Sequence, residues 1–149
     1  MFRDIITETM LWFQKALPQP TSKNFHTQLG VHFEEVNEML MELSTEDFET
    51  QIFIDNAKAS LNALATHLKA SNEIITLRDR ERYLDALCDQ IVTAAGCAHI
   101  SDMDLPGALS EVNSSNYSKF DENGNPFFDV NRKVIKGPGY RKADLSAFI

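Results

Sequence analysis

The stretch from Leu29 to Leu40, which reads LGVHFEEVNEML, decides the fold class of this chain. Its apolar residues recur at steps of three and four, which is the period of one face of an α-helix. The stripe contains Leu29, Phe33, Val36, Leu40 and, just beyond the stretch, Leu43. A helix with one apolar stripe has to bury that stripe against other elements, so the pattern predicts a helix within a helical bundle.

Four more helices are predicted on either side of this stretch. A helix over residues 2–17 has the same period and ends before Pro18, because proline cannot continue a helix. Capping residues at 21–24 begin the central helix, over about 24–43, and those at 44–47 begin another that ends near 71–72. The last two helices cover about 76–100 and 105–116, with Pro106 in the favoured first turn.

The character of the sequence changes after Phe120. Two short β-prone runs, Phe127–Val130 and Lys133–Lys136, flank Asn131-Arg132 as in a β-hairpin. We therefore predict an all-α fold: a four- to five-helix bundle over residues 1–118, and an irregular C-terminal arm over 119–149 with a short β-hairpin. The length of 149 residues suits a single domain over the whole chain.

Composition and charge exclude several classes of protein. Hydrophobic residues make up 43% and charged residues 24%, which is typical of a globular chain. The net charge of −8 argues against a protein that binds nucleic acid or a membrane through a basic surface. No apolar run approaches the roughly 20 residues that span a bilayer. Cys88 and Cys97 are too far apart along one helix to bridge, so we expect reduced, half-buried thiols in a cytoplasmic protein.

Two helices carry clustered carboxylates. Glu34, Glu35 and Glu38 lie within one turn of the central helix, where like charges destabilise a helix unless a cation lies between them. Asp85 and Asp89 lie one turn apart on the fourth predicted helix. If the two helices pack antiparallel, these hard oxygen ligands converge and suit Mg²⁺ or Mn²⁺. The alternative is a solvated acidic face, with Arg78 and Arg82 pairing with Asp85.

The two carboxylate motifs and the C-terminal part together resemble the MazG-type all-α nucleoside triphosphate pyrophosphatases. Their pattern of EExxE, a spacer and ExxD is similar to His32–Leu40, followed by Leu84–Asp89 with Gly96 beyond. The run EVNSSNYSKF at Glu111–Phe120, the run KVIKGPGY at Lys133–Tyr140 and the pair Asp144-Leu145 are similar to the tail of small phage and bacterial members. The resemblance covers the chain from about Phe25 to Leu145.

The resemblance implies a reaction and roles for individual residues. Members cleave a nucleoside triphosphate to the monophosphate and pyrophosphate with Mg²⁺, for which Mn²⁺ is a possible substitute. The implied metal ligands are Glu35, Glu38, Asp85 and Asp89, and Glu34 and Glu35 are the implied catalytic carboxylates. The implied substrate-binding residues are Asn116, Lys119, Lys136 and Tyr140. Family bundles are completed between subunits, so a homodimer or tetramer is implied, in the cytoplasm of a bacterium or of a phage-infected host.

One departure from the family pattern keeps alternatives open. The position that matches the family's ExxD glutamate is Ala86, which cannot ligate a metal, and we assign the role to Asp85, one residue earlier on the same face. Deoxynucleotides are favoured as substrates, with dGTP or dCTP and dUTP first. The alternatives are a non-catalytic helical regulatory protein that binds partners, and a pyrophosphohydrolase acting on phosphoribosyl-ATP.

Overall fold

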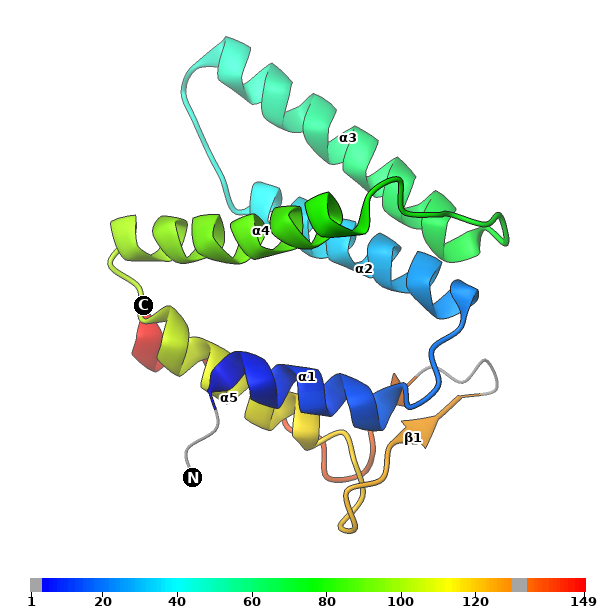
Figure 1. Cartoon of the computed structure of the whole chain (residues 1–149). Coiled ribbons are helices and arrows are strands. Elements are labelled where there is room, and N and C mark those ends of the chain that lie inside the picture. Colours follow the sequence, from blue (N-terminus) through cyan, green and yellow to red (C-terminus); the bar gives the residue numbers. More distant parts are fainter. Residues whose placement is uncertain (1–3, 130–133) are drawn as a thin grey trace. The chain divides into compact units, whose positions relative to one another are not determined.

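The computed structural model describes residues 4–129 and 134–149, and these form two compact units (Figure 1). The first unit comprises the chain up to Pro18 and from Arg78 onward, and the second comprises Gln19–Leu77. The described residues contain five α-helices and one two-stranded antiparallel hairpin, which confirms the predicted all-α fold with a C-terminal hairpin. That the bundle and the arm act as one domain stays a prediction.

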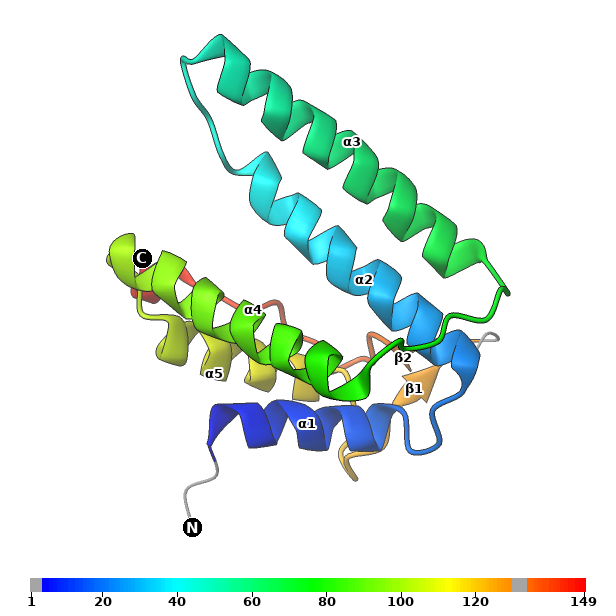
Figure 2. The ribbon, with the colours of Figure 1, turned by 45° about the horizontal axis from the view of Figure 1, so that its top comes forward.

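The second unit is an antiparallel pair of helices, α2 (Ser22–Met41) and α3 (Phe48–Ala70) (Figure 2). The predicted caps begin both helices. Thr21 and Asn24 form a reciprocal capping box on α2, and Asp47 accepts hydrogen bonds from both the backbone N–H and the hydroxyl of Thr50 on α3. A side chain that satisfies a free N–H of the first turn stabilises a helix start by about 1 kcal/mol.

Small and polar residues hold this pair together at the end where the chain enters α2. Gly30 is buried, and a Cβ atom there would lie 2.8 Å from the carbonyl oxygen of Ala65 on α3, so the glycine permits close packing of the helices. His26 is 2% exposed, and its Nε2 accepts the backbone N–H of Ile75 at 3.0 Å. The ammonium of Lys23 donates to the carbonyl oxygens of Lys69 and of Ser71. The lysine thereby caps the C-terminal end of α3.

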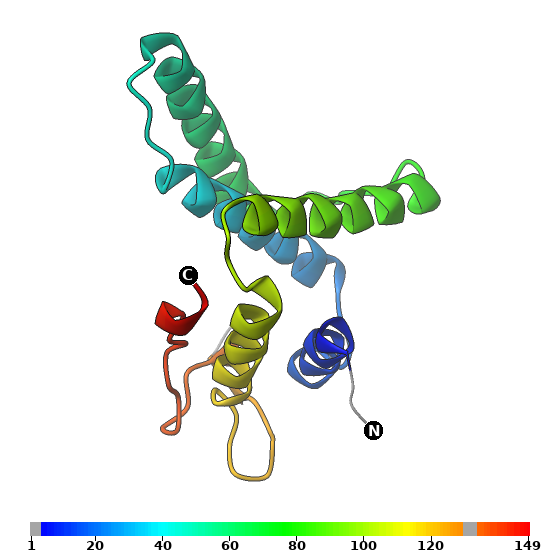
Figure 3. The same ribbon diagram turned by 90° about the vertical axis from the view of Figure 1, so that its left-hand side faces the viewer.

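The first unit is built on α1 (Ile5–Ala16) and α5 (Leu105–Tyr117), which lie side by side and run in the same direction (Figures 1 and 3). Hydrogen bonds join them along their length. The buried Asn113 donates to the carbonyl oxygen of Ile5 and accepts from the Thr9 hydroxyl, and the Tyr117 hydroxyl donates to the carbonyl oxygen of Glu8.

The fourth helix, α4 (Arg80–Ile100), begins at Arg80 rather than at the predicted Thr76. Asp79 is its N-cap and accepts the N–H of Arg82, and this local cap determines the start. None of the residues of α4 is buried. The apolar stripe of α4, formed by Leu84, Leu87, Ile91, Ala94 and Ala98, is therefore not part of a core in the described residues: Leu84 is 62% and Ile91 52% exposed. Periodicity predicts which face is apolar, but it does not provide a surface to cover that face.

The C-terminal arm begins with β1 (Phe127–Phe128) and β2 (Val134–Ile135), in which Phe127 pairs with Ile135 and Phe128 with Val134. The predicted turn at Asn131-Arg132 lies outside the described residues. The chain then returns antiparallel to α5, seen in Figure 3 as the orange and red segment, and ends in a short 3₁₀-helix, η1 (Ser146–Phe148). Gly107 on α5 makes room for the ring of Phe148, and the carbonyl oxygen of Phe148 accepts the N–H of Asp104.

Two smaller predictions concern the cysteines and the membrane. Cys88 and Cys97 are both free, as expected, but both are exposed rather than half-buried, because they belong to the uncovered helix α4. Of the helices in the described residues, none has the length and apolarity that a membrane crossing requires.

Candidate functional site

The carboxylates predicted on α2 lie in the second unit and differ in their surroundings. Glu35 and Glu38 are exposed, while Glu34 is partly covered. Glu34 forms an ion pair with Lys69 of α3, with 2.8 Å between its Oε1 and the lysine Nζ. The two side chains remain 45% and 34% exposed, so water screens the pair and its contribution to stability is at most about 1 kcal/mol.

Lys69 is a residue that sequence reasoning missed. Its aliphatic stem crosses α2 at Gly30, where an added Cβ would lie 2.7 Å from the lysine Cγ. Gly30 is one turn before Glu34, so the absence of a side chain there lets the lysine reach the carboxylate. The signal in the sequence was a glycine inside an otherwise regular amphipathic helix, which often marks close approach of another element.

The carboxylates predicted on α4 lie in the first unit. Asp85 and Asp89 are both exposed and one helical turn apart, so their carboxylates project from the same face. On the same helix, an added Cβ at Gly96 would find no atom within 4 Å.

The donor set suits a hard divalent cation. Mg²⁺ is commonly held by one or two carboxylates, with waters and substrate phosphates completing its coordination. Each helix offers one such pair, Glu35 with Glu38 on α2 and Asp85 with Asp89 on α4. Within either unit, over residues 4–129 and 134–149, no three His, Cys, Asp or Glu side chains come together in a geometry that holds a metal ion.

Two of the predicted substrate-binding residues, Asn116 and Lys119, contact each other at the C-terminal end of α5. The ammonium of Lys119 donates to Oδ1 of Asn116 at 2.8 Å and lies 5.5 Å from the ring centre of Trp12 on α1. The Trp12 indole N–H donates to the carbonyl oxygen of Asn116 at 2.9 Å. The sequence does not reveal the contact of Trp12 with Lys119, because α1 and α5 are far apart in the chain.

The other two predicted residues lie on the arm. The N–H of Gly137 donates to the carbonyl oxygen of Lys119 at 3.2 Å, and this bond brings the arm against the end of α5. Lys136, next to that glycine, has its ammonium 4.6 Å from the ring centre of Tyr140. The four residues thus form two side-chain pairs, Asn116 with Lys119 and Lys136 with Tyr140, on segments joined by one backbone hydrogen bond. Cations and hydrogen-bond donors of this kind bind phosphate.

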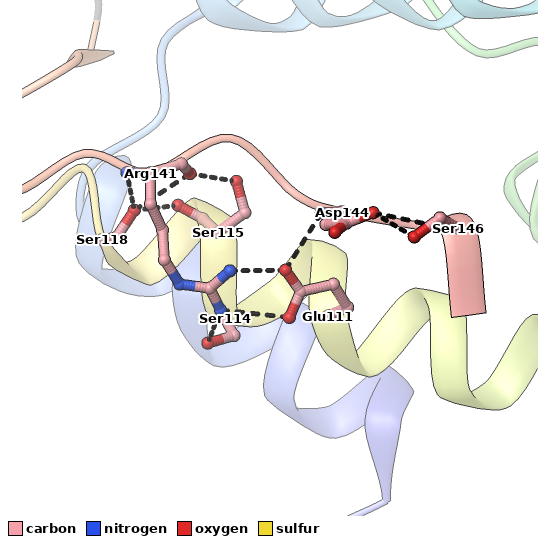
Figure 4. Close-up of polar contacts among 7 residues, drawn as sticks. All are labelled: Glu111, Ser114, Ser115, Ser118, Arg141, Asp144 and Ser146. Carbon is pink, nitrogen blue, oxygen red and sulfur yellow. Dashed lines mark hydrogen bonds and ion pairs between the residues drawn. The ribbon is translucent and has the colours of Figure 1, made fainter. Parts of the chain in front are cut away.

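A clamp around Arg141 holds the arm on α5 (Figure 4). The guanidinium donates to both carboxylate oxygens of Glu111 and, at 2.6 Å, to the hydroxyl of Ser114. The carbonyl oxygen of Arg141 accepts a hydrogen bond from the Ser115 hydroxyl at 2.8 Å, and the backbone N–H of Arg141 donates to Ser118 Oγ at 2.9 Å. The hydrogen bonds from Arg141 hold the pKa of the Glu111 carboxyl below its ordinary value of 4.5, because they stabilise the ionised form.

Comparison of this chain with protein-family models, with curated proteins and with solved structures finds no match. The resemblance to the MazG family therefore rests on the motifs of the sequence.

Proposed function

We propose that this protein is a Mg²⁺-dependent nucleoside triphosphate pyrophosphohydrolase of the MazG-like kind, which converts a nucleoside triphosphate and water into the monophosphate and pyrophosphate. Deoxynucleotides are the proposed substrates, with dGTP or dCTP and dUTP favoured. The observation that carries the proposal is the hydrogen bond from the N–H of Gly137 to the carbonyl oxygen of Lys119, which brings the two segments of the tail together. One segment has the pair Asn116 and Lys119, and the other has the pair Lys136 and Tyr140. The sequence resemblance selects these four residues for the nucleotide, and the pairing of their segments supports the proposal.

In this proposal the carboxylates hold the metal and prepare the water. Glu35, Glu38, Asp85 and Asp89 are the ligands, and their exposure leaves them accessible to an ion and to substrate phosphates. The metal supplies positive charge that offsets the charge on the phosphates during cleavage. Glu34, held by Lys69, and Glu35 are the groups that accept a proton from the attacking water. The water oxygen forms a bond to the α-phosphorus as the bond to the pyrophosphate oxygen breaks.

In this proposal the four tail residues, Asn116, Lys119, Lys136 and Tyr140, bind the nucleotide away from the metal ligands. Lys119 and Lys136 place positive charge beside the phosphates, and the Asn116 amide is positioned to hydrogen-bond a polar edge of the nucleotide. The arm clamp at Arg141 keeps this part of the chain on α5, so the pairing of the two segments does not depend on the nucleotide.

A homodimer or tetramer is part of the proposal. Large apolar side chains on α3 and α4 are exposed, including Phe48 at 79%, Phe53 at 64% and Leu84 at 62%. Exposed apolar surface of this kind marks an interface when it is contiguous. Light scattering coupled to size exclusion tests this part, and a mass of 16.8 kDa at all concentrations would exclude it.

Product analysis by anion-exchange chromatography tests the reaction. The purified protein is incubated with each common ribo- and deoxynucleoside triphosphate, and with phosphoribosyl-ATP, with and without Mg²⁺. Formation of monophosphate and pyrophosphate only with the metal is the expected result, and the panel ranks the bases. Diphosphate and phosphate as products would reject the proposed cleavage position.

Two alternatives are separated by the same experiment. Turnover of phosphoribosyl-ATP alone would assign the chain to that substrate. The absence of turnover on every substrate with Mg²⁺ would favour the non-catalytic regulatory protein, for which the replacement of the family glutamate by Ala86 is the supporting feature.

A further inference from the structure

Trp12 occupies an unusual place in the first unit. It is the single tryptophan of the chain, and it lies on α1, outside the carboxylate motifs and the tail. Its indole ring stacks on the ring of Phe120, with 5.7 Å between centroids and 7° between planes. Phe120 is buried at 6% exposure, so the tryptophan rests on a fixed support.

Trp12 restricts Lys119 through two contacts, one with the backbone of its turn and one with its ammonium. The carbonyl oxygen of Asn116 accepts both the indole N–H of Trp12, at 2.9 Å, and the backbone N–H of Lys119, at 3.2 Å. The tryptophan therefore secures the turn from which Lys119 projects. The ammonium of Lys119 then lies 5.5 Å from the indole centre, within the distance at which an aromatic face attracts a cation.

The consequence is a pre-organised cation. A lysine side chain has about 2 kcal/mol of rotamer entropy to lose when it is held in one place. Here the Asn116 amide oxygen and the Trp12 ring already restrict the ammonium, so less is lost when an anion binds. A residue that only filled space would use neither the indole N–H nor the ring face.

We propose that Trp12 is a positioning residue that holds Lys119 and Asn116 in the arrangement that binds a phosphate group of the substrate. The inference rests on the proposed function in one respect, namely that the phosphate belongs to a nucleoside triphosphate. Trp12 itself does not contact the phosphate. Its effect is on binding, so its loss raises KM more than it lowers kcat.

The experiment uses the single tryptophan as its own reporter. Inorganic pyrophosphate with Mg²⁺ is titrated into the full chain, with indole emission excited selectively. Binding at Lys119 moves a charge beside the ring, so we expect a saturable change in emission. Lys119→Met, which keeps the length of the side chain and removes the charge, should lose this response. Lys142→Met, an exposed lysine of the same unit, should retain it.

Variants of Trp12 itself complete the test by calorimetry with the same probe. Trp12→Phe keeps an aromatic face and loses the N–H, and we expect about three-fold weaker binding of pyrophosphate. Trp12→Leu loses both, and we expect about ten-fold weaker binding. Circular dichroism identifies any variant that fails to fold; if Trp12→Leu does, Trp12→Phe and Lys119→Met still decide the result.

The outcomes separate this inference from the proposed function. Wild-type affinity in a folded Trp12→Leu, or a wild-type emission that does not respond to pyrophosphate, would overturn the positioning role. Nucleotide turnover with an unchanged KM in Trp12→Leu would do the same while leaving the proposed function intact. A graded loss of pyrophosphate affinity without turnover of any nucleotide would support the positioning role and reject the proposed function.

Discussion

The two helices that carry the candidate metal ligands are packed in contrasting ways. The helix α2 lies along α3, contains the buried His26 and Gly30, and has its carboxylate Glu34 held by Lys69. The helix α4 has a similar length and a similar apolar stripe, yet none of its residues is buried. Gly30 is tightly enclosed, whereas Gly96 has no neighbour within 4 Å of an added Cβ.

The contrast teaches that an amphipathic sequence can form a helix even where its own unit does not bury its apolar face. Both helices have sound N-caps, so local hydrogen bonds determine where each one starts. Of the two, α2 packs along another helix of its own unit, and its apolar stripe is half-buried there, with Leu43 still 50% exposed. The exposed apolar residues of α4, such as Leu84 and Ile91, are part of the surface that enters the proposal of an oligomer.

The largest expected effect is on turnover, and here the two helices should behave alike although they are packed differently. If both carboxylate pairs serve the proposed metal, Glu38→Gln on α2 and Asp89→Asn on α4 should each lower turnover by on the order of a hundred-fold or more. Release of pyrophosphate measures the rate, and calorimetry with Mn²⁺ measures metal binding. Glu73→Gln, an exposed carboxylate of the second unit, is the matched control and should retain activity. Full activity in Asp89→Asn would restrict the site to α2.

A second change tests the packing of α2 directly. His26→Ala removes a buried ring and leaves the N–H of Ile75 without its acceptor, so we expect a loss of about 2–4 kcal/mol in the free energy of unfolding. Urea denaturation followed by circular dichroism measures it. His67→Ala, at an exposed position on α3, should change stability by less than about 0.5 kcal/mol. Equal effects of the two variants would contradict the role given to His26.

Two glycine substitutions sharpen the contrast, because one should lower the stability of the protein and the other should raise it. Gly30→Ala places a Cβ against backbone atoms of α3 and should destabilise the protein by about 1–3 kcal/mol. Gly96→Ala meets no atom and should stabilise α4 by about 0.5–1 kcal/mol, since alanine favours a helix interior. Melting temperatures of both variants give the answer. Loss of stability in Gly96→Ala would mean that α4 has a close neighbour in solution.

A smaller effect on stability is expected at the ion pair of Glu34. Lys69→Met should lower the free energy of unfolding by no more than about 1 kcal/mol, because both side chains are partly exposed. Turnover should fall as well, since the carboxylate proposed to accept a proton loses its support. Lys58→Met removes another paired lysine of α3, which bonds Asp55, and is the matched control. If the two variants have equal turnover, Lys69 has no role at the site.

The smallest expected effect is on the pH dependence of stability, through the contact between Glu111 and Arg141 in the first unit. The pKa of Glu111 is lowered in the folded chain, so the folded state binds this proton less readily than the unfolded state. The stabilisation is present above about pH 4.5, the ordinary value, and is lost as pH falls through the lower folded value. Arg141→Met should flatten the fall of melting temperature below pH 4.5, measured by scanning calorimetry in matched buffers. An unchanged slope would remove the arm clamp as its cause.

The candidate site was predicted in part. The sequence selected Asn116, Lys119, Lys136 and Tyr140, and in the structure they form two pairs on segments joined by a backbone hydrogen bond. Their role in binding a nucleotide stays a prediction. Nothing in the sequence pointed to Arg141 or to the contact of Trp12 with Lys119, and for Lys69 there was only the indirect signal of Gly30. Each of these contacts depends on a partner at least 23 positions away in the chain, as the Ser118–Arg141 bond illustrates. Periodicity and capping signals extend over a few residues only.

The sequence by itself determined the five helices, the caps of α2 and α3 and the hairpin, because hydrogen bonds within a turn and the spacing of apolar residues are local properties. It also determined which helix faces are acidic. Only the tertiary structure decided that Glu34 is paired, that Lys119 rests on Trp12, and that the stripe of α4 stays uncovered. These are matters of which surfaces meet, and the folding of the whole chain, not the periodicity of one segment, decides that.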